Sequence, residues 1–283
     1  MSISGRTGAR AVLFVPWLGR FATTLASGVT VLLRPPRAPV SAVASVAALR
    51  RFAGIVMLAV IAIAATMIFV DAAAIQWQRR LQPSIVQVFE EITDYGRSGW
   101  LLIPIGVLML VIAAISSPTL GRMANLVLAS LSVRLGYLFL AIALPSLVVT
   151  IGKRLIGRVR PSDLGPFAYE PLSWRATYAS LPSGHATTVF AALVAIGILW
   201  PRARAILWLY ALTIAVSRVV VSAHYPSDVL AGALCGALGA LLVRDWFAVR
   251  RLGFYFAGDG SVRPLPGASF ARLKKVARRW FAQ

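Results

Sequence analysis

Long apolar stretches alternate with short polar ones through most of this chain, and each apolar stretch is bounded by charged or turn-forming residues. A helix needs about 20 largely apolar residues to cross the hydrocarbon core of a bilayer. The pattern therefore predicts an all-α fold, a six-span transmembrane helical bundle. The six predicted spans are at about residues 52–74, 100–117, 126–151, 185–200, 205–222 and 226–243.

A different periodicity occupies the connection between the first two spans, residues 76–100. Charged residues there are interleaved with apolar ones at helical spacing, namely Ile85, Val86, Val88, Phe89 and Ile92. This spacing predicts an amphipathic helix along the outer surface of the membrane. Such a helix would either line a lateral entrance for lipid or pack on neighbouring helices, and the pattern alone does not separate the two.

Composition excludes an ordinary soluble domain. Of the 283 residues, 59% are hydrophobic and only 13% are charged, and the mean hydropathy is +0.78. The net charge of +20 would suggest a nucleic-acid partner in a soluble protein, but Lys and Arg gather between the apolar stretches instead of along one polar face. No nucleic-acid partner is expected. The single cysteine, Cys235, has no partner for an intrachain disulfide.

The distribution of positive residues predicts the orientation in the membrane. With a cytoplasmic N-terminus, 20 of the 29 Lys and Arg residues fall on the inner side. Cytoplasmic flanks of spans collect Lys and Arg, so both termini are expected inside, where basic tails attract anionic lipid headgroups. Three parts follow: a basic cytoplasmic or interfacial segment 1–51, a six-span membrane domain 52–244 and a basic cytoplasmic tail 245–283. Residues 11–33 either lie on the membrane surface or form a seventh span.

Three short polar stretches carry the chemistry. The first leaves the third span, and six residues separate its Lys153 from Arg160 and Pro161. Lys supplies a point charge and Arg a planar fork of donors, so two cations at a membrane edge suit a phosphate group. Taken alone, interfacial anchoring is the commoner explanation of such residues.

The second stretch is Pro182, Ser183, Gly184 and His185, directly before the fourth span. Ser183 can cap the helix, Gly184 lets the backbone approach an anion, and the first turn carries free N–H groups with a partial positive charge. The stretch therefore predicts a phosphate-binding helix N-terminus with a titratable histidine beside it. An ordinary cap followed by an interfacial histidine is the alternative.

The third stretch joins the fifth and sixth spans and contains Ser217, Arg218, His224 and Asp228. An arginine near the end of a span is costly to bury and needs an anionic partner. Pro226 separates the two helices, which puts His224 at the break between them. Asp228, in the first turn of the next helix, could accept a hydrogen bond from one ring nitrogen of His224 and leave the other free to attack.

The predicted topology places all three stretches on one face of the membrane. Under the orientation given by the charge bias, each emerges on the outer side, so their residues can meet. The chain's only two histidines, His185 and His224, both fall in these stretches. A base, an orienting carboxylate and several cations at one membrane face predict a catalytic site.

Together these residues resemble the signature of the type 2 phosphatidic acid phosphatase superfamily, which has a Lys-to-Arg-Pro element, a Pro-Ser-Gly-His element and a Ser-Arg-to-His-to-Asp element. Every signature position is present with the family's internal spacing between Lys153 and Asp228. The resemblance implies an integral membrane lipid phosphatase, built as a helical bundle with its site near the membrane surface.

The resemblance also implies a role for each residue. His224 attacks phosphorus and forms a phosphohistidine, Asp228 holds the tautomer of His224, and His185 protonates the leaving oxygen and later activates water. The phosphate oxygens are held by Lys153, Arg160, Ser183, the backbone of Gly184 and Arg218. Phosphoryl transfer needs mainly in-line positioning and stabilisation of charge, so this cage can replace a metal, and no metal or other cofactor is expected.

The sequence leaves the lipid itself open. The candidates are a polyprenyl diphosphate, phosphatidic acid or phosphatidylglycerol phosphate, and lipid A. Arg154, Arg158 and Arg175 add positive charge in the same outer loop, which leans toward a headgroup with more than one anionic unit. They can equally be solvated or face lipid.

Two alternative functions stay open. One is a phosphotransferase that passes the phosphoryl group to another lipid instead of water. The other is a lipid transporter or binding protein that does not turn substrate over, although binding alone would not require two histidines and Asp228. The small size and the alanine- and arginine-rich makeup indicate a bacterial source. The protein would then lie in the inner membrane with its site in the periplasm; its oligomeric state is not predicted.

Overall fold

The computed structural model describes residues 19, 22–24, 26–37, 46–116, 120–161, 164–268, 271, 272, 274 and 278. Parts of the predicted segments 1–51, 11–33 and 245–283 therefore lie outside the described residues. The chain divides into two compact units. One comprises Met1–Ala38, Gly106–Gly136 and Phe247–Gln283, and the other comprises Pro39–Ile105 and Tyr137–Trp246. The three polar stretches all belong to the second unit.

Helices account for each of the six apolar stretches. They are α2 (Val46–Phe69), α5 (Gly99–Ile115), α6 (Arg122–Ile156), α7 (Gly184–Leu199), α8 (Arg204–Val220) and α9 (Pro226–Val249), and the described residues also form α3 (Asp71–Gln78) and α4 (Pro83–Asp94). Single-turn 3₁₀ helices occupy Ala176–Tyr178 and Pro201–Ala203. Predominantly helical structure is thus confirmed, and α4 confirms the helix predicted between the first two spans.

Five helical segments of the described chain are long and apolar enough to cross a membrane. They are Leu49–Phe69, Pro83–Ile115, Arg122–Ile156, Pro201–Val220 and Pro226–Val249. Helix α7 is apolar but shorter, because Pro201 disfavours helical geometry at Trp200 and ends it there. The membrane-spanning fold is confirmed, whereas a sixth crossing by α7 stays a prediction.

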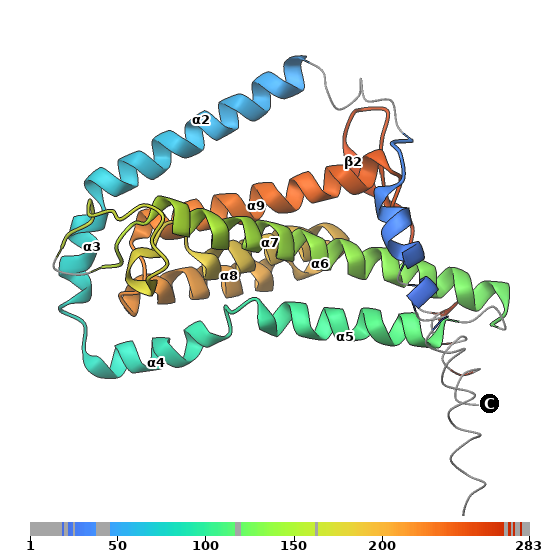
Figure 1. Ribbon diagram of the computed structural model, residues 1–283, viewed down its shortest axis with the longest axis horizontal. Helices are drawn as coiled ribbons and strands as arrows, with labels where there is room; N and C mark the ends of the chain where they lie inside the picture. The colour runs from blue at the N-terminus through green and yellow to red at the C-terminus, as the bar shows by residue number, and fades with distance from the viewer. Residues whose placement is uncertain are drawn as a thin grey trace, which may run out of the picture. The chain divides into compact units, whose positions relative to one another are not determined.

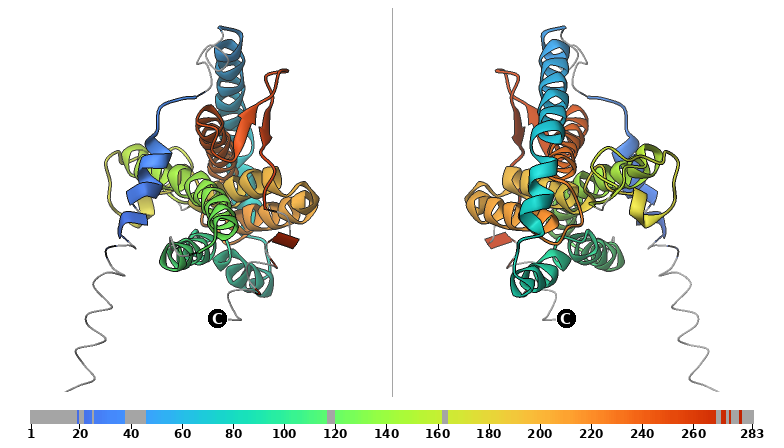
Figure 2. Two further views of the ribbon diagram at one scale, coloured as in Figure 1. Left: turned by 90° about the vertical axis from the view of Figure 1, so that its right-hand side faces the viewer. Right: turned by 90° about the vertical axis from the view of Figure 1, so that its left-hand side faces the viewer.

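The first unit contains a short hairpin that the sequence did not predict. Strands β1 (Phe254–Phe256) and β2 (Val262–Pro264) pair antiparallel, with Tyr255 opposite Arg263, and Figure 2 shows them side by side. Arg134 donates to the carbonyl of Leu265 at 2.7 Å, which ties the chain after the hairpin to the first half of α6.

The core of the second unit forms where α7 packs on α8. Val189 and Leu193 from α7 meet Ala211 and Ile214 from α8, and Ile92 from α4 packs against the same cluster. Figure 1 shows α7 and α8 side by side, with the loop after α6 at the same end of the unit as α3. Helix α4 therefore packs on a neighbour, while a lipid entrance along it stays a prediction.

A glycine-rich face on α9 brings this helix into close contact with α7. A Cβ on Gly232 would lie 2.3 Å from the carbonyl oxygen of Ser183, and one on Gly236 would lie 2.2 Å from that of Thr187. Glycines four residues apart let membrane helices approach each other closely. This approach sets the distance between Ser183 and the first turn of α9.

Substituting Gly232 by alanine is expected to lower stability by about 1–3 kcal/mol, because the added methyl overlaps the α7 backbone. Thermal unfolding of the detergent-solubilised protein measures the effect. Gly54→Ala on α2 is the matched control, since a Cβ there meets no atom within 4 Å in the part of the chain that the structure describes. Equal melting temperatures for the two variants would show that α9 does not need this close approach.

Candidate active site

The chain leaves α6 by a turn that only glycine accommodates. Gly157 has a φ of +67°, in the left-handed region that commonly ends helices, and a Cβ there would lie 1.8 Å from the carbonyl oxygen of Glu170. Lys153 thus stays in the last turn of α6 while Arg158 and Arg160 lie on the following loop. The backbone N–H of Arg160 donates to the carbonyl of Thr177 at 2.8 Å, which fixes the loop.

Backbone hydrogen bonds join the other two stretches. The N–H of Ser183, just before α7, donates to the carbonyl of Asp228 at 2.9 Å, and the N–H of His224 donates to the carbonyl of Arg218 at 3.1 Å. His185 therefore starts α7 beside the first turn of α9, and His224 lies in the turn between α8 and α9.

The predicted cations and histidines lie within electrostatic range of one another. Lys153 interacts with the charges of Arg160 and Arg218. His185 interacts with Arg218, His224 and Lys153. The structure thus brings together the five ionisable side chains that the sequence placed around phosphate, and three of them are permanent or near-permanent cations that repel one another.

Three polar atoms in this cluster are buried without a protein partner. Within the described residues, Nε of Arg160, Nε of Arg218 and Oγ of Ser183 make no hydrogen bond. Buried donors without partners are uncommon in folded proteins and call for an explanation. Three of them among clustered cations indicate a binding place for an anion with several oxygens.

Ser183 was predicted to cap α7, and its side chain does not do so. Its carbonyl instead accepts from the N–H of Thr187 at 3.0 Å and from the hydroxyl of the same residue at 2.8 Å. The hydroxyl of Ser183 is left over for a ligand. A Cβ on Gly184 would meet no atom of the described residues within 4 Å, which leaves space beside this helix N-terminus.

Arg218 is oriented by a residue that the sequence analysis missed. Its Nη1 donates to Oγ1 of Thr93 at 2.6 Å, and Oγ of Ser217 donates to the same oxygen at 2.9 Å. Thr93 lies on α4, 125 positions away in the chain. Docking of α4 on α8 therefore fixes the guanidinium in place.

His224 is buried, with only 4% of its side chain exposed. Its Nδ1 is 3.7 Å from Oδ2 of Asp228 and 3.5 Å from Oγ of Ser180. Asp228 thus stands at ion-pair distance from the ring instead of the hydrogen-bond distance predicted. Burial lowers the pKa of His224, although the Asp228 carboxylate opposes this shift. With Nδ1 turned toward Ser180 and Asp228, Nε2 is the nitrogen left to react.

Asp228 is held by several donors. Ser180 donates its hydroxyl to Oδ2 at 2.5 Å, and the N–H of Tyr225 donates to the same oxygen at 3.0 Å. On the other side, Nη1 of Arg158 donates to Oδ1 at 2.7 Å. An aspartate with all these bonds has a fixed carboxylate plane, which suits it to orient a neighbouring imidazole.

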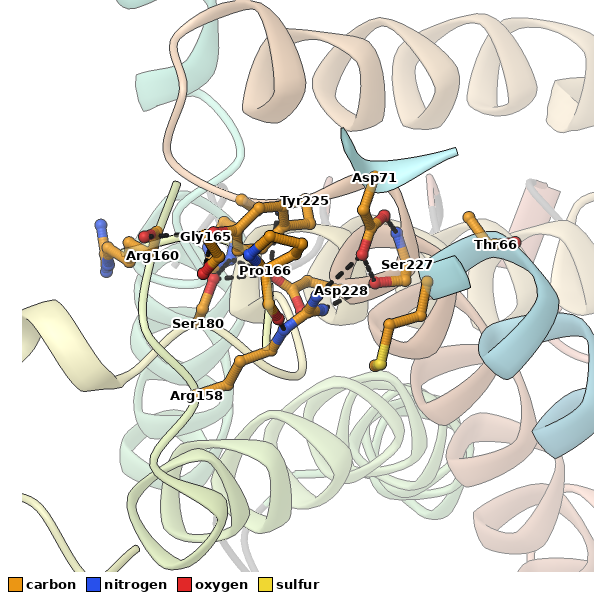
Figure 3. Close-up of polar contacts among 12 residues, drawn as sticks. Thr66, Asp71, Arg158, Arg160, Gly165, Pro166, Ser180, Tyr225, Ser227 and Asp228 are labelled. Carbon is orange, nitrogen blue, oxygen red and sulfur yellow. Dashed lines mark hydrogen bonds and ion pairs between the residues drawn. The ribbon is translucent and has the colours of Figure 1, made fainter. Parts of the chain in front are cut away.

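Arg158 lies between two buried carboxylates, as Figure 3 shows. Its Nη2 pairs with Asp71 at 2.8 Å and its Nη1 with Asp228 at 2.7 Å, and all three side chains are fully buried. The hydroxyl of Ser227 bridges Arg158 and Asp71, because it accepts a hydrogen bond from Arg158 and donates one to Asp71. The suggestion that Arg158 serves a multiply anionic headgroup is therefore wrong: its charge is already paired inside the protein.

The other two arginines proposed for the headgroup differ from Arg158. Arg154 donates through Nη1 to the carbonyls of Trp174 and Arg175, at 2.7 and 3.0 Å, so it braces the outer loop. The side chain of Arg175 is exposed. A role for either in binding lipid stays a prediction.

Similarity to known proteins covers the same stretches. A family model described as the PAP2 superfamily matches residues 134–252. A lipid A 1-phosphatase of Rhizobium etli is 34% identical over 218 residues, which are 76% of this chain and 92% of that protein. A lipid A 1-phosphatase of Rhizobium johnstonii is 42% identical over 127 residues, 44% of this chain and only 52% of that protein.

Two solved structures are more distant. LpxE of Aquifex aeolicus is 22% identical, with coverage of 62% of this chain and 94% of that one and a TM-score of 0.45. A transmembrane PAP2 type phosphatidylglycerolphosphate phosphatase from Bacillus subtilis is 20% identical, with coverage of 80% and 95% and a TM-score of 0.45.

Proposed function

Because this chain belongs to the PAP2 superfamily and is an integral membrane lipid phosphatase, we propose that it hydrolyses its substrate through a phosphohistidine on His224 without a metal. The observation that carries this proposal is the set of buried, unpartnered donors on Arg160, Arg218 and Ser183 beside two histidines. These three donors equal the non-bridging oxygens of a phosphoryl group in number, and the positive charge of Lys153 complements the negative charge of those oxygens.

In the first step, Nε2 of His224 attacks phosphorus in line with the departing oxygen. The N–P bond forms as the P–O bond breaks, and the electron pair goes to the leaving oxygen, which takes a proton from His185. Lys153, Arg160 and Arg218 stabilise the negative charge on the phosphoryl oxygens throughout. Arg158 takes no part here, since Asp71 and Asp228 occupy its donors.

In the second step, water attacks the phosphohistidine. His185, deprotonated by the first step, accepts a proton from the water as the O–P bond forms and the N–P bond breaks. Inorganic phosphate leaves, and both histidines return to their starting state. Asp228 steadies His224 through both steps by the charge that it holds 3.7 Å from Nδ1.

The proposed substrate is the 1-phosphate of a lipid A-type glycolipid. The support is the Rhizobium etli relative, a lipid A 1-phosphatase of which 92% aligns with this chain. The positive-residue bias further supports a site on the periplasmic face of a bacterial inner membrane with both termini cytoplasmic.

Purified protein given a panel of single lipid phosphates tests the reaction. The panel contains lipid A 1-phosphate, phosphatidic acid, phosphatidylglycerol phosphate and a polyprenyl diphosphate, each with and without a chelator. The expected result is inorganic phosphate from lipid A 1-phosphate, undiminished by the chelator. A strict need for an acceptor lipid would instead identify a phosphotransferase, and sensitivity to the chelator would contradict the metal-free cage.

The pH dependence tests the nucleophile. A lowered pKa keeps His224 unprotonated at lower pH, so kcat/KM is expected to persist as pH falls through about 6.5 and to drop only below it. The substrate phosphate itself ionises at about pH 6. The variant Asp228→Asn distinguishes this ionisation from that of His224. That change removes a charge that favours protonated His224, so the acid limb should move further toward acid; a limb that stays in place would belong to the substrate.

A further inference from the structure

A cavity of about 180 Å³ opens beside the ring of His185. Its walls come from the connection between α4 and α5, from the second half of α6 and from the first turns of α7. The lining residues are Gly96, Arg97, Ser98, Ser146, Thr150, Gly184, His185 and Thr188. Four of the eight carry a hydroxyl group, although the helices that bear most of them are otherwise apolar.

The hydroxyl protons on the α6 and α7 walls are already committed to the protein. Thr188 donates to the carbonyl of Gly184 at 3.1 Å, so Ser146, 3.2 Å from Thr188, is the donor in that pair. Thr150 donates to the carbonyl of Ser146 at 2.8 Å. A hydroxyl that donates inward still has lone pairs, and this wall therefore presents hydrogen-bond acceptors to the cavity.

The wall that the α4–α5 connection forms lies close against His185. A Cβ on Gly96 would lie 2.9 Å from Cδ2 of His185 and 2.5 Å from the side chain of Ile214. Only glycine lets this turn approach the ring so closely. Arg97 follows it, paired with Asp94 at 2.7 Å on the surface, and adds positive charge at the edge of the cavity.

The cavity extends away from the cation cluster along a membrane-spanning helix. Ser146 lies ten positions before the end of α6 at Ile156, a distance of about 15 Å along a helix. Polar side chains at such a depth are costly unless they serve a ligand or another helix. A group bound here would extend from the phosphoryl site toward the bilayer.

We propose that this cavity binds the alcohol that leaves the phosphate, and that it selects an alcohol with hydroxyl or amide N–H donors close to the phosphate. This inference rests on the proposed function, because the role of His185 as the acid puts the leaving oxygen next to the cavity. The hydroxyl and amide groups of a sugar headgroup would donate to Ser146 and Thr150. A diacylglycerol offers only ester acceptors there, so its ester oxygens and the acceptor oxygens of the cavity wall would both stay without a hydrogen bond.

The test compares kcat/KM for two lipid phosphates in the same mixed micelles. Phosphatidylglycerol phosphate carries a hydroxyl donor next to the phosphate, whereas phosphatidic acid carries only esters. The wild type is expected to favour the first. In the double variant Ser146→Ala, Thr150→Val, the ratio of the two kcat/KM values should fall about 10-fold, since each lost hydrogen bond is worth a factor of about 2 to 10.

Any general loss of folded enzyme lowers both kcat/KM values equally and cancels in their ratio. The matched control is Thr66→Val. Thr66 makes the same bond to the carbonyl four residues earlier, Ala62, at 2.8 Å, but on α2, outside the cavity. Its ratio should equal that of the wild type. Phosphate release with a ratio that the double variant leaves unchanged, or a wild-type preference for phosphatidic acid, would overturn the subsite alone. Release from lipid A 1-phosphate but from neither of these two lipids would also overturn the subsite alone, since phosphatidylglycerol phosphate offers the hydroxyl donor that the subsite selects. No release from lipid A 1-phosphate or from either of the two would overturn the proposed function and the subsite with it.

Discussion

The variant His224→Ala is expected to lose phosphate release by about four orders of magnitude or more, because the covalent route has no other nucleophile. The measurement is kcat for lipid A 1-phosphate with purified protein in detergent. Lipid binding should persist, since the cations and the hydroxyl of Ser183 that hold the phosphoryl oxygens are unchanged.

His185→Ala serves as the matched comparison for this prediction. It removes an acid whose contribution is about 10²- to 10⁴-fold, so its residual activity should exceed that of His224→Ala. Both variants should melt near the wild-type temperature. If His224→Ala kept a tenth of the activity, water would be attacking phosphorus directly.

Arg158→Met is expected to lower the free energy of unfolding by about 3–5 kcal/mol, because it leaves the buried carboxylates of Asp71 and Asp228 without their counter-charge. Thermal unfolding measures the loss, and activity should fall with it as Asp228 loses its hydrogen bond. Adding Asp71→Asn should recover part of the stability, since one of the two uncompensated charges is then gone.

Arg175→Met is the control for that experiment. The exposed Arg175 side chain lies on the same outer loop, and such a surface change is expected to stay within about 0.5 kcal/mol. A similar loss in both arginine variants would mean that the loop tolerates no substitution, and the buried pairing would then not be the cause. The network that Arg158 and Asp71 share would likewise be contradicted if the stability losses of Arg158→Met and Asp71→Asn simply added in the double variant.

Spacing and topology were enough to predict where most of the site residues gather. Pro226 places His224 at a helix break, and helix ends on one side of a bundle must lie near each other, so Lys153, His185 and Arg218 could be grouped without coordinates. The helical fold followed from apolar stretches of spanning length. Helix α7 matches the predicted stretch 185–200 in position, but with 16 residues it is shorter than the five segments of spanning length, so its crossing stays a prediction.

The supporting residues could not be predicted in the same way. Asp71 and Thr93 meet their arginines across 87 and 125 positions, and no local pattern encodes such pairs. Asp71 alone left a signal, since a lone carboxylate near the end of the first predicted span, 52–74, is costly without a partner. Arg158 was misjudged because a cation on an outer loop is usually solvated, and only the fold reveals the two carboxylates around it.

The phosphohistidine on His224 can be trapped by alkaline quenching of a single turnover, followed by mass spectrometry of the digested chain. Alkali preserves a phosphohistidine and acid destroys it. The covalent mechanism predicts an acid-labile phosphate on the peptide that contains His224, formed before inorganic phosphate appears and absent from His224→Ala. Phosphate release from the wild type with no label on any peptide, or with the label on a different residue, would contradict it.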